Sequence, residues 1–174
     1  MYLRRERDGD SPAIAVVHSE AFVRPDAPDA VPPEVELVAL LRASDAWIPA
    51  LSIVAAEDAS IVGHVVCTRA TIAGVIPVLG LGPLGVAPSH QGAGVGSALM
   101  HAVLAAADAL DEHLVCLLGN PRYYGRFGFA PARERGIEAP EDWYGDHFQV
   151  RLLTNATGLE HGRFEYAPAF ASVP

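Results

Sequence analysis

The chain has 174 residues and a mass of 18.4 kDa, which fits one domain with a substantial core. Hydrophobic residues make up 51% of it and the mean hydropathy is +0.23, which excludes an intrinsically disordered chain. No apolar run approaches the ~20 residues of a membrane helix. The charged start is followed only by the short apolar run Ala13–Val17, so we expect no signal peptide and a cytoplasmic protein.

The charge balance is acidic, with 12 basic residues, all arginine, against 21 acidic residues and a net charge of −9. This balance argues against nucleic acid or an anionic membrane as the main partner, because both require a basic face. It mildly favours a cationic substrate, although an acidic surface also simply aids solubility. Two cysteines exclude a disulfide scaffold and a four-cysteine zinc site, and the seven histidines lack metal-ligand spacing. We therefore expect no metal.

The first half of the chain predicts a short strand, two helices and a hairpin. In order, these are a strand at 2–7, helices at 11–22 and from 33, and strands at 51–57 and 61–71. Ser11 followed by proline predicts the N-cap of the first helix. Val35, Val38 and Leu41 predict the buried side of the second helix. Asp58 and the alanine after it predict the hairpin turn.

The second half predicts a strand at 75–86, a helix at 94–110, a strand at 113–118, a short helix at 122–127, and strands at 129–133 and 149–153. The strand–helix–strand order around the long helix predicts one right-handed parallel crossover within a mixed sheet. Gly82 and Pro83 interrupt the strand at 75–86. Proline cannot donate to a ladder, so this dipeptide predicts a bulge or a splayed edge, or simply the end of an edge strand.

The glycine-rich segment Gln91–Gly96 separates that strand from the long helix. Glycines allow a close approach of the backbone to a ligand, and the amides and dipole of a helix start favour an anion. The combination predicts a cradle for a pyrophosphate; the plain alternative is a tightly packed turn. A P-loop is excluded because the chain has no lysine. The pattern GxGxxG occurs at Gly80–Gly85, but inside a strand, so a dinucleotide fold is disfavoured.

The same segment resembles the GCN5-related N-acetyltransferase (GNAT) superfamily. Gln91, Gly94 and Gly96 match the Gln-x-x-Gly-x-Gly motif that binds the pyrophosphate of acetyl coenzyme A in that superfamily. The strand before it matches at 84–86 and Pro88, and Tyr124–Phe129 matches the second motif, Tyr-x-x-x-Gly-Phe. The Gly63-His64 pair, LGPLGV and GNPRYYGRFGF are similar to the YhbS-type branch.

The resemblance implies an α/β fold of the α+β mixed type. It implies a mostly antiparallel sheet of about seven strands that is splayed at the acetyl-CoA site, with helices on both faces. We expect a single domain over 1–174, with the motif core at 76–130 and C-terminal strands and a tail at 131–174. A homodimer is compatible with this family.

The resemblance further implies an enzyme that moves the acetyl group of acetyl-CoA directly to an unidentified acceptor amine in a ternary complex. The alternative is a non-catalytic acyl-CoA-binding or regulatory module on the same fold. The expected cofactor-binding residues are Leu84, Gly85, Val86, Gln91, Gly92, Ala93, Gly94, Val95, Gly96, Ser97, Asn120 and Tyr124.

Tyr124 stands where the superfamily places its general acid, so we expect it to protonate the departing thiolate; packing against the core or cofactor is the alternative. The neighbouring Tyr123 points about 100° away on a helix. The general base is not identifiable from the sequence. Candidate residues at the acceptor side are Glu20, His64 and Trp143, with His18 as a further candidate base. Tyr144 could line the acceptor pocket beside Trp143, and a packing role is the alternative for both rings. The two cysteines lie in apolar strands and predict inert thiols.

Overall fold

The computed structural model describes residues 1–173. The order of its longer elements is β1 (Tyr2–Arg5), α1 (Ser11–Ala21), α2 (Pro33–Arg42), β2 (Trp47–Glu57), β3 (Ser60–Ile72), β4 (Ile76–Val86), α3 (Val95–Ala109), β5 (Leu114–Leu118), α4 (Pro121–Tyr124) and β8 (Phe148–Leu152). The remaining strands are short: β6 (Ala130–Pro131) and β7 (Ile137–Glu138) lie before β8 in the chain, and β9 (Gly162–Glu165) lies after it. Most of the expected elements are thus present, with ends shifted by a few residues.

One sheet organises the molecule, with strand order β1-β2-β3-β4-β5-β8-β6. β4 and β5 are parallel and are joined through α3, which confirms the predicted parallel crossover. The other pairs along this path are antiparallel. The described residues form nine strands rather than about seven, because β7 and β9 add a short extension beside β3. These strands have two and four residues, too few for a period-2 pattern to predict.

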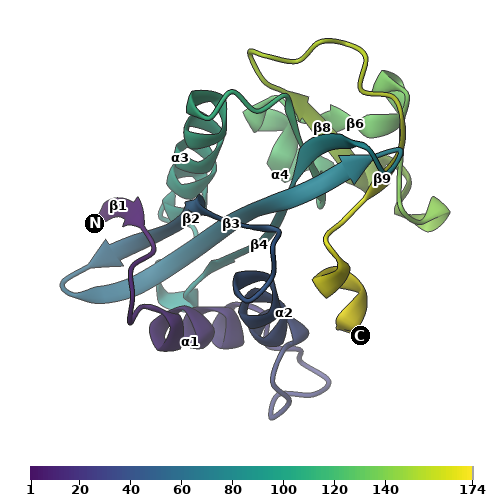
Figure 1. The fold of residues 1–174 in the computed structure, drawn as a ribbon. Coiled ribbons are helices and arrows are strands. Elements are labelled where there is room, and N and C mark those ends of the chain that lie inside the picture. The colour runs from purple at the N-terminus through teal and green to yellow at the C-terminus, as the bar shows by residue number, and fades with distance from the viewer. Residues whose placement is uncertain (174) are drawn as a thin grey trace.

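The helices cover both faces of the sheet, as Figure 1 shows: α3 lies on one face, and α1 and α2 lie on the other. Alternation along the strands explains this arrangement, because successive side chains point to opposite faces. Val65 and Cys67 of β3 pack in one core cluster with Leu99 and Val103 of α3. On the opposite face, Val54 packs with apolar side chains of α1 and α2.

Two local expectations need correction. Asp10, rather than Ser11, precedes α1, and its carboxylate accepts hydrogen bonds from Arg4 and the Arg7 amide instead of capping the helix. Val35 is only half-buried, whereas Leu37 takes its place beside Val38 and Leu41.

The predicted strand at 129–133 is also largely wrong. Pairing with β8 covers only Ala130 and Pro131, after which the chain turns through a short 3-10 helix.

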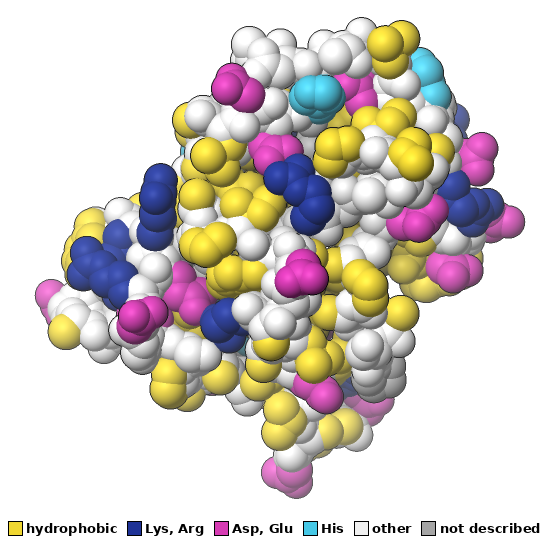
Figure 2. Space-filling view, in the orientation of Figure 1, with side chains coloured by type: hydrophobic (Ala, Val, Ile, Leu, Met, Phe, Trp, Pro, Cys, Tyr) yellow, Lys and Arg dark blue, Asp and Glu magenta, His cyan; other side chains and the backbone are white. Residues whose placement is uncertain are grey.

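Charged side chains are mixed on the face shown in Figure 2, where acidic and basic groups alternate over short distances. A single-sign basic stripe of the kind that tracks nucleic acid is not visible on that face. Within residues 1–173, no helix has the length and apolar character needed to cross a membrane.

Candidate active site

β4 and β5 diverge in the middle of the sheet and open a gap. Their pairing covers only Leu79 with Val115 and Gly80 with Cys116. Beyond these pairs, β4 continues to Val86 while β5 turns away at Leu118. A bulge lies at the start of the divergence, because Leu81 and Leu84 oppose Cys67 and Val65 of β3 with one extra residue on the β4 side. The splayed edge predicted from Gly82 and Pro83 is therefore confirmed.

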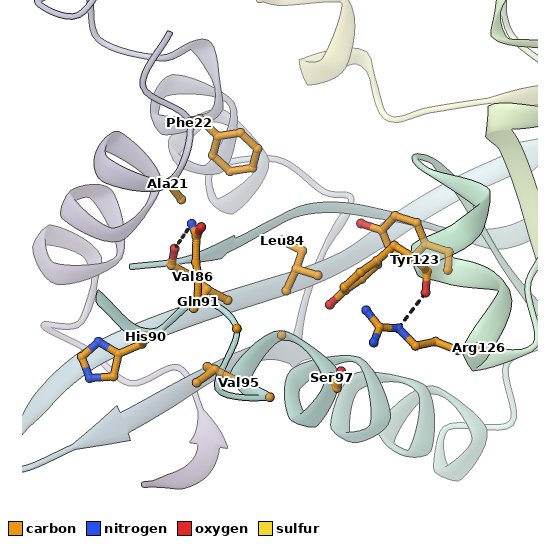
Figure 3. A pocket seen from close by; sticks show the side chains of 14 residues that line it. Ala21, Phe22, Leu84, Val86, His90, Gln91, Val95, Ser97, Tyr123 and Arg126 are labelled. Carbon is orange, nitrogen blue, oxygen red and sulfur yellow. Dashed lines mark hydrogen bonds between the residues drawn. The ribbon is translucent and has the colours of Figure 1, made fainter. Parts of the chain in front are cut away.

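The glycine-rich loop closes one end of this gap. Gly92 and Gly94 have φ of 74° and 87°, which is the left-handed region that favours glycine. Gly94 is the N-cap of α3, so the first amides of that helix face the gap without an intrahelical partner. The Gln91 side-chain amide donates to the Val86 carbonyl at 2.9 Å and ties the loop to the end of β4 (Figure 3). This arrangement forms a helix-start anion site.

A cavity of about 470 Å³ lies at this gap, and we call it the glycine cavity. Its lining residues are Ala21, Phe22, Leu84, Val86, His90, Gln91, Gly92, Gly94, Val95, Gly96, Ser97, Tyr123, Tyr124 and Arg126. The structure thus brings together most of the residues expected to hold the cofactor. Figure 3 shows side chains from the end of α1, from β4, from α3 and from α4 surrounding one space.

Three of the expected cofactor residues do not line this cavity: Gly85, Ala93 and Asn120. Gly85 faces α1, where a Cβ atom would lie 2.7 Å from His18 Nδ1. Asn120 is the N-cap of α4 and its side chain accepts from the Arg122 amide at 2.9 Å. Asn120 thus positions the helix that carries the two tyrosines.

Sequence reasoning missed several lining residues, of which Arg126 adds a positive charge. Its Nε donates to the Tyr123 carbonyl at 3.0 Å, and its guanidinium lies 4.2 Å from the centre of the Tyr123 ring. The signal available in the sequence was its place inside the second motif. Ala21 and Phe22 were missed because only the three-dimensional packing brings the end of α1 to the gap.

A second cavity of about 300 Å³ adjoins the first, and we call it the aromatic cavity. Its lining residues are Phe22, Glu34, Leu37, Leu81, Gly82, Pro83, Leu84, Leu118, Tyr124, Tyr144, Tyr166 and Phe170. Phe22, Leu84 and Tyr124 line both cavities. The two spaces therefore meet at these three side chains, and a group held there is accessible from both sides.

Tyr124 stands at this junction with a protonated phenol. Burial, together with the nearby Tyr123, raises the pKa of Tyr124 to about 12. The ring packs edge-on against Tyr123 at a centroid distance of 4.8 Å and against Phe129 at 6.0 Å. Because the phenol keeps its proton at neutral pH, it can donate to a group that develops negative charge. Burial also raises the pKa of Tyr123, although Arg126 opposes the shift.

Gly119 leaves the space that the Tyr124 ring occupies. A Cβ atom at Gly119 would lie 2.2 Å from Tyr124 Cε2, so Gly119→Ala must displace the ring. We expect this variant to lower the turnover of an acyl-transfer reaction about tenfold or more, since small misplacements of a reacting group are costly. Steady-state kinetics measure this effect. Gly125→Ala is the control in the same segment, because nothing lies within 4 Å of its Cβ position. Equal activity of both variants would contradict the positioning.

His64 is buried within a network of hydrogen-bonded polar side chains on the sheet face that α1 covers. His18 Nε2 and His64 Nδ1 are 2.8 Å apart, and His64 Nε2 is 2.9 Å from the Ser52 hydroxyl. Ser52 in turn donates to Glu6, which is ion-paired with Arg42. Both histidine rings are fully buried, and both ring nitrogens of His64 have partners. This network anchors α1 to the sheet, and His64 does not line either cavity.

The buried network of His18 and His64 predicts that the folded protein loses stability in acid. Burial, together with the charge of Arg42, lowers the pKa of His18 to about 4, and burial lowers that of His64 well below its ordinary value. The unfolded chain therefore binds more protons than the folded one below about pH 6.5, so stability falls as the pH falls from there towards 4. The His18 contribution reaches roughly 3 kcal/mol below pH 4. Urea unfolding of wild type and His18→Gln at pH 7 and pH 5 measures it; equal pH slopes would contradict this view.

The remaining candidate residues lie outside both cavities. Glu20 is exposed on α1, and Trp143 is 76% exposed, although its neighbour Tyr144 lines the aromatic cavity. Cys67 and Cys116 are fully buried, and burial raises the pKa of both thiols. In the described part of the chain, no group of three or more His, Cys, Asp or Glu side chains is arranged to hold a metal ion.

Comparison with known proteins assigns this site to a family. The model of the acetyltransferase (GNAT) domain matches residues 49–131. The uncharacterized N-acetyltransferase YjhQ of Escherichia coli K12 is 39% identical over 128 residues, which are 71% of each chain. The chain belongs to the GNAT family. Its fold is similar to the crystal structure of the GNAT family N-acetyltransferase YhbS from Escherichia coli in complex with CoA, with a TM-score of 0.85 and 25% identity over 98% of this chain and 91% of that one.

A second solved structure is similar along nearly the whole length. A GNAT family acetyltransferase from Brucella melitensis in complex with acetyl-CoA has a TM-score of 0.76 and 32% identity, over 97% of both chains. These relatives confirm the superfamily and the YhbS-type branch expected from the motifs. As a GNAT enzyme the protein is an acyltransferase.

Proposed function

We propose that this GNAT protein transfers the acetyl group of acetyl-CoA directly to an amine within a ternary complex. The observation that carries the proposal is the meeting of the glycine cavity and the aromatic cavity at Phe22, Leu84 and Tyr124. A cofactor in the first cavity and an acceptor in the second would touch at one point. That geometry suits direct attack, since reacting groups must be held about 3–3.5 Å apart.

The glycine cavity supports binding of acetyl-CoA. The loop amides at 92–96 and the start of α3 suit the pyrophosphate, and Arg126 adds a nearby cation. The extended pantetheine arm then follows the side of β4 that has lost β5. Between Leu81 and Val86, the backbone on that side has no strand partner in the described residues, so it can pair with the arm as with an added strand.

The thioester then lies at the junction of the cavities. A backbone amide in the segment 84–86 polarises its carbonyl oxygen, as an oxyanion donor does. The acceptor nitrogen uses its lone pair to form the new C–N bond and releases one proton to solvent. The C–S bond breaks with its electron pair on sulfur. Tyr124 donates its phenolic proton to that sulfur and later regains a proton from solvent. The products are the acetylated amine and free CoA thiol.

Release of free thiol from acetyl-CoA tests this proposal. We expect thiol release that depends on an added amine, with the amine gaining one acetyl group by mass spectrometry. Binding of acetyl-CoA without amine-dependent release across primary, secondary and peptide amines would favour the non-catalytic acyl-CoA-binding alternative. Transfer of the acetyl group to a cysteine of the enzyme before the amine is added would contradict direct transfer. Both cysteine thiols are buried, which argues against such an acetyl-cysteine intermediate.

A further inference from the structure

The aromatic cavity has a composition that points to one class of acceptor. Four aromatic side chains line it besides Tyr124: Phe22, Tyr144, Tyr166 and Phe170. They come from distant parts of the chain, and only folding brings the C-terminal segment against α1 and α2. Tyr166 packs against Phe170 at a centroid distance of 4.4 Å and against Phe164 at 4.7 Å. These contacts fix the rings that form the aromatic wall of the cavity.

Glu34 gives this largely aromatic space a negative charge. Among the described residues that line the aromatic cavity, Glu34 is the charged one, and it is half-buried in the first turn of α2. The neighbouring aliphatic groups, such as Leu37 and Leu81, are buried and offer no hydrogen bond. An occupant that satisfies both features carries a positive charge at one end and an apolar or aromatic body, and tyrosine faces also attract a cation.

The volume restricts the occupant further. A space of about 300 Å³ lies at the lower limit of the volumes typical of small-molecule pockets. A peptide lysine brings only an aliphatic stem and an ammonium group into this space, and so covers less of the aromatic wall than an aromatic amine does. A polyamine carries several charges, whereas the lining supplies one carboxylate. Both are therefore poorer fits than a compact amine.

We infer that the acceptor is a small primary amine with an aromatic or bulky apolar body, bound in the aromatic cavity with its ammonium group near Glu34. This inference rests on the proposed function. The ammonium form binds, and loss of one proton to solvent gives the neutral amine whose lone pair attacks the thioester at Leu84 and Tyr124. The acetylated product has lost the positive charge, so its attraction to Glu34 is gone and it leaves more readily.

Steady-state thiol release with three probe amines tests the inference: 2-phenylethylamine, spermidine and a lysine-containing peptide. We expect kcat/KM for 2-phenylethylamine to exceed both others at least tenfold. Glu34→Gln is expected to raise the KM for 2-phenylethylamine about tenfold, with kcat and the KM for acetyl-CoA little changed. Glu36→Gln is the matched control, because Glu36 is exposed in the same first turn and does not line the cavity.

Each outcome decides a specific point. Preference for spermidine or the peptide, or equal effects of Glu34→Gln and Glu36→Gln, would overturn the inferred class while leaving the acetyltransferase function in place. Absence of turnover with every amine, while acetyl-CoA still binds, would overturn the proposed function and the inference with it. Thermal melting of both variants verifies that they are folded.

Discussion

Tyr124→Phe is expected to lower kcat about 10²-fold or more, because it removes the proton donor and keeps the ring. General acids contribute factors of this size. The pKa of about 12 keeps the phenol protonated, so the wild-type donor is present throughout the neutral range. The KM for acetyl-CoA should stay nearly constant, since the lost interaction forms mainly as charge develops on sulfur. Steady-state kinetics with a fixed amine measure both parameters.

Tyr123→Phe is the internal control for this prediction. The Tyr123 hydroxyl faces α3, where a Cβ atom at Gly96 would lie 2.6 Å from it, so it is placed to stabilise the loop–helix junction. Its loss should cost far less than the loss of the Tyr124 hydroxyl. A crippled Tyr123→Phe beside a near-normal Tyr124→Phe would show that the other tyrosine is the acid. Normal turnover in both would show that water or no protein group protonates the thiolate.

Gly94→Val is expected to weaken acetyl-CoA binding at least 100-fold. Gly94 has φ of 87° at the N-cap of α3, and a β-branched residue is strongly disfavoured there. The variant must reorganise the loop amides that we propose bind the pyrophosphate. Titration calorimetry with acetyl-CoA measures the loss of affinity.

Gly9→Val provides a control with matched strain. Gly9 has φ of 90° and, like Gly94, has nothing within 4 Å of its Cβ position, but it lies between β1 and α1, outside both cavities. Both substitutions should destabilise the fold by similar amounts, of the order of 1–2 kcal/mol, while only Gly94→Val loses the cofactor. Unchanged affinity in a folded Gly94→Val protein would refute the cradle.

Most of the residues that the structure places around the glycine cavity could be named from the sequence, because the determinants of this part of the site are local. The segment Gln91–Gly96 joins one strand to one helix, and the geometry of such a turn is largely fixed by its own glycines. The same holds for the bulge at Gly82 and Pro83, which the register of β3 and β4 confirms. Local determinants of this kind do not depend on contacts with distant parts of the chain.

The lining of the aromatic cavity could not be predicted because its determinants are distant in the chain. Tyr166 and Phe170 reach the cavity through the pairing of β9 with β3, a strand of four residues that carries no usable periodicity. His64 was a candidate base, but in the structure it is hydrogen-bonded to His18. The two histidines are 46 residues apart in the chain, and no pattern in the sequence pairs them. Trp143 and Tyr144 were both candidates for the acceptor pocket. Tyr144 lines the aromatic cavity and Trp143 is exposed, because a tight turn decides which of two adjacent rings faces inward.

The most direct test of this account is a crystal structure of the protein with acetyl-CoA. We predict the pyrophosphate on the amides of 92–96, the pantetheine arm along β4 beyond Gly80, and the thioester sulfur within hydrogen-bond reach of the Tyr124 hydroxyl, with the acetyl group facing the aromatic cavity. A pyrophosphate bound away from the glycine loop, or a sulfur atom out of reach of Tyr124 with its acetyl group pointing away from the aromatic cavity, would contradict it.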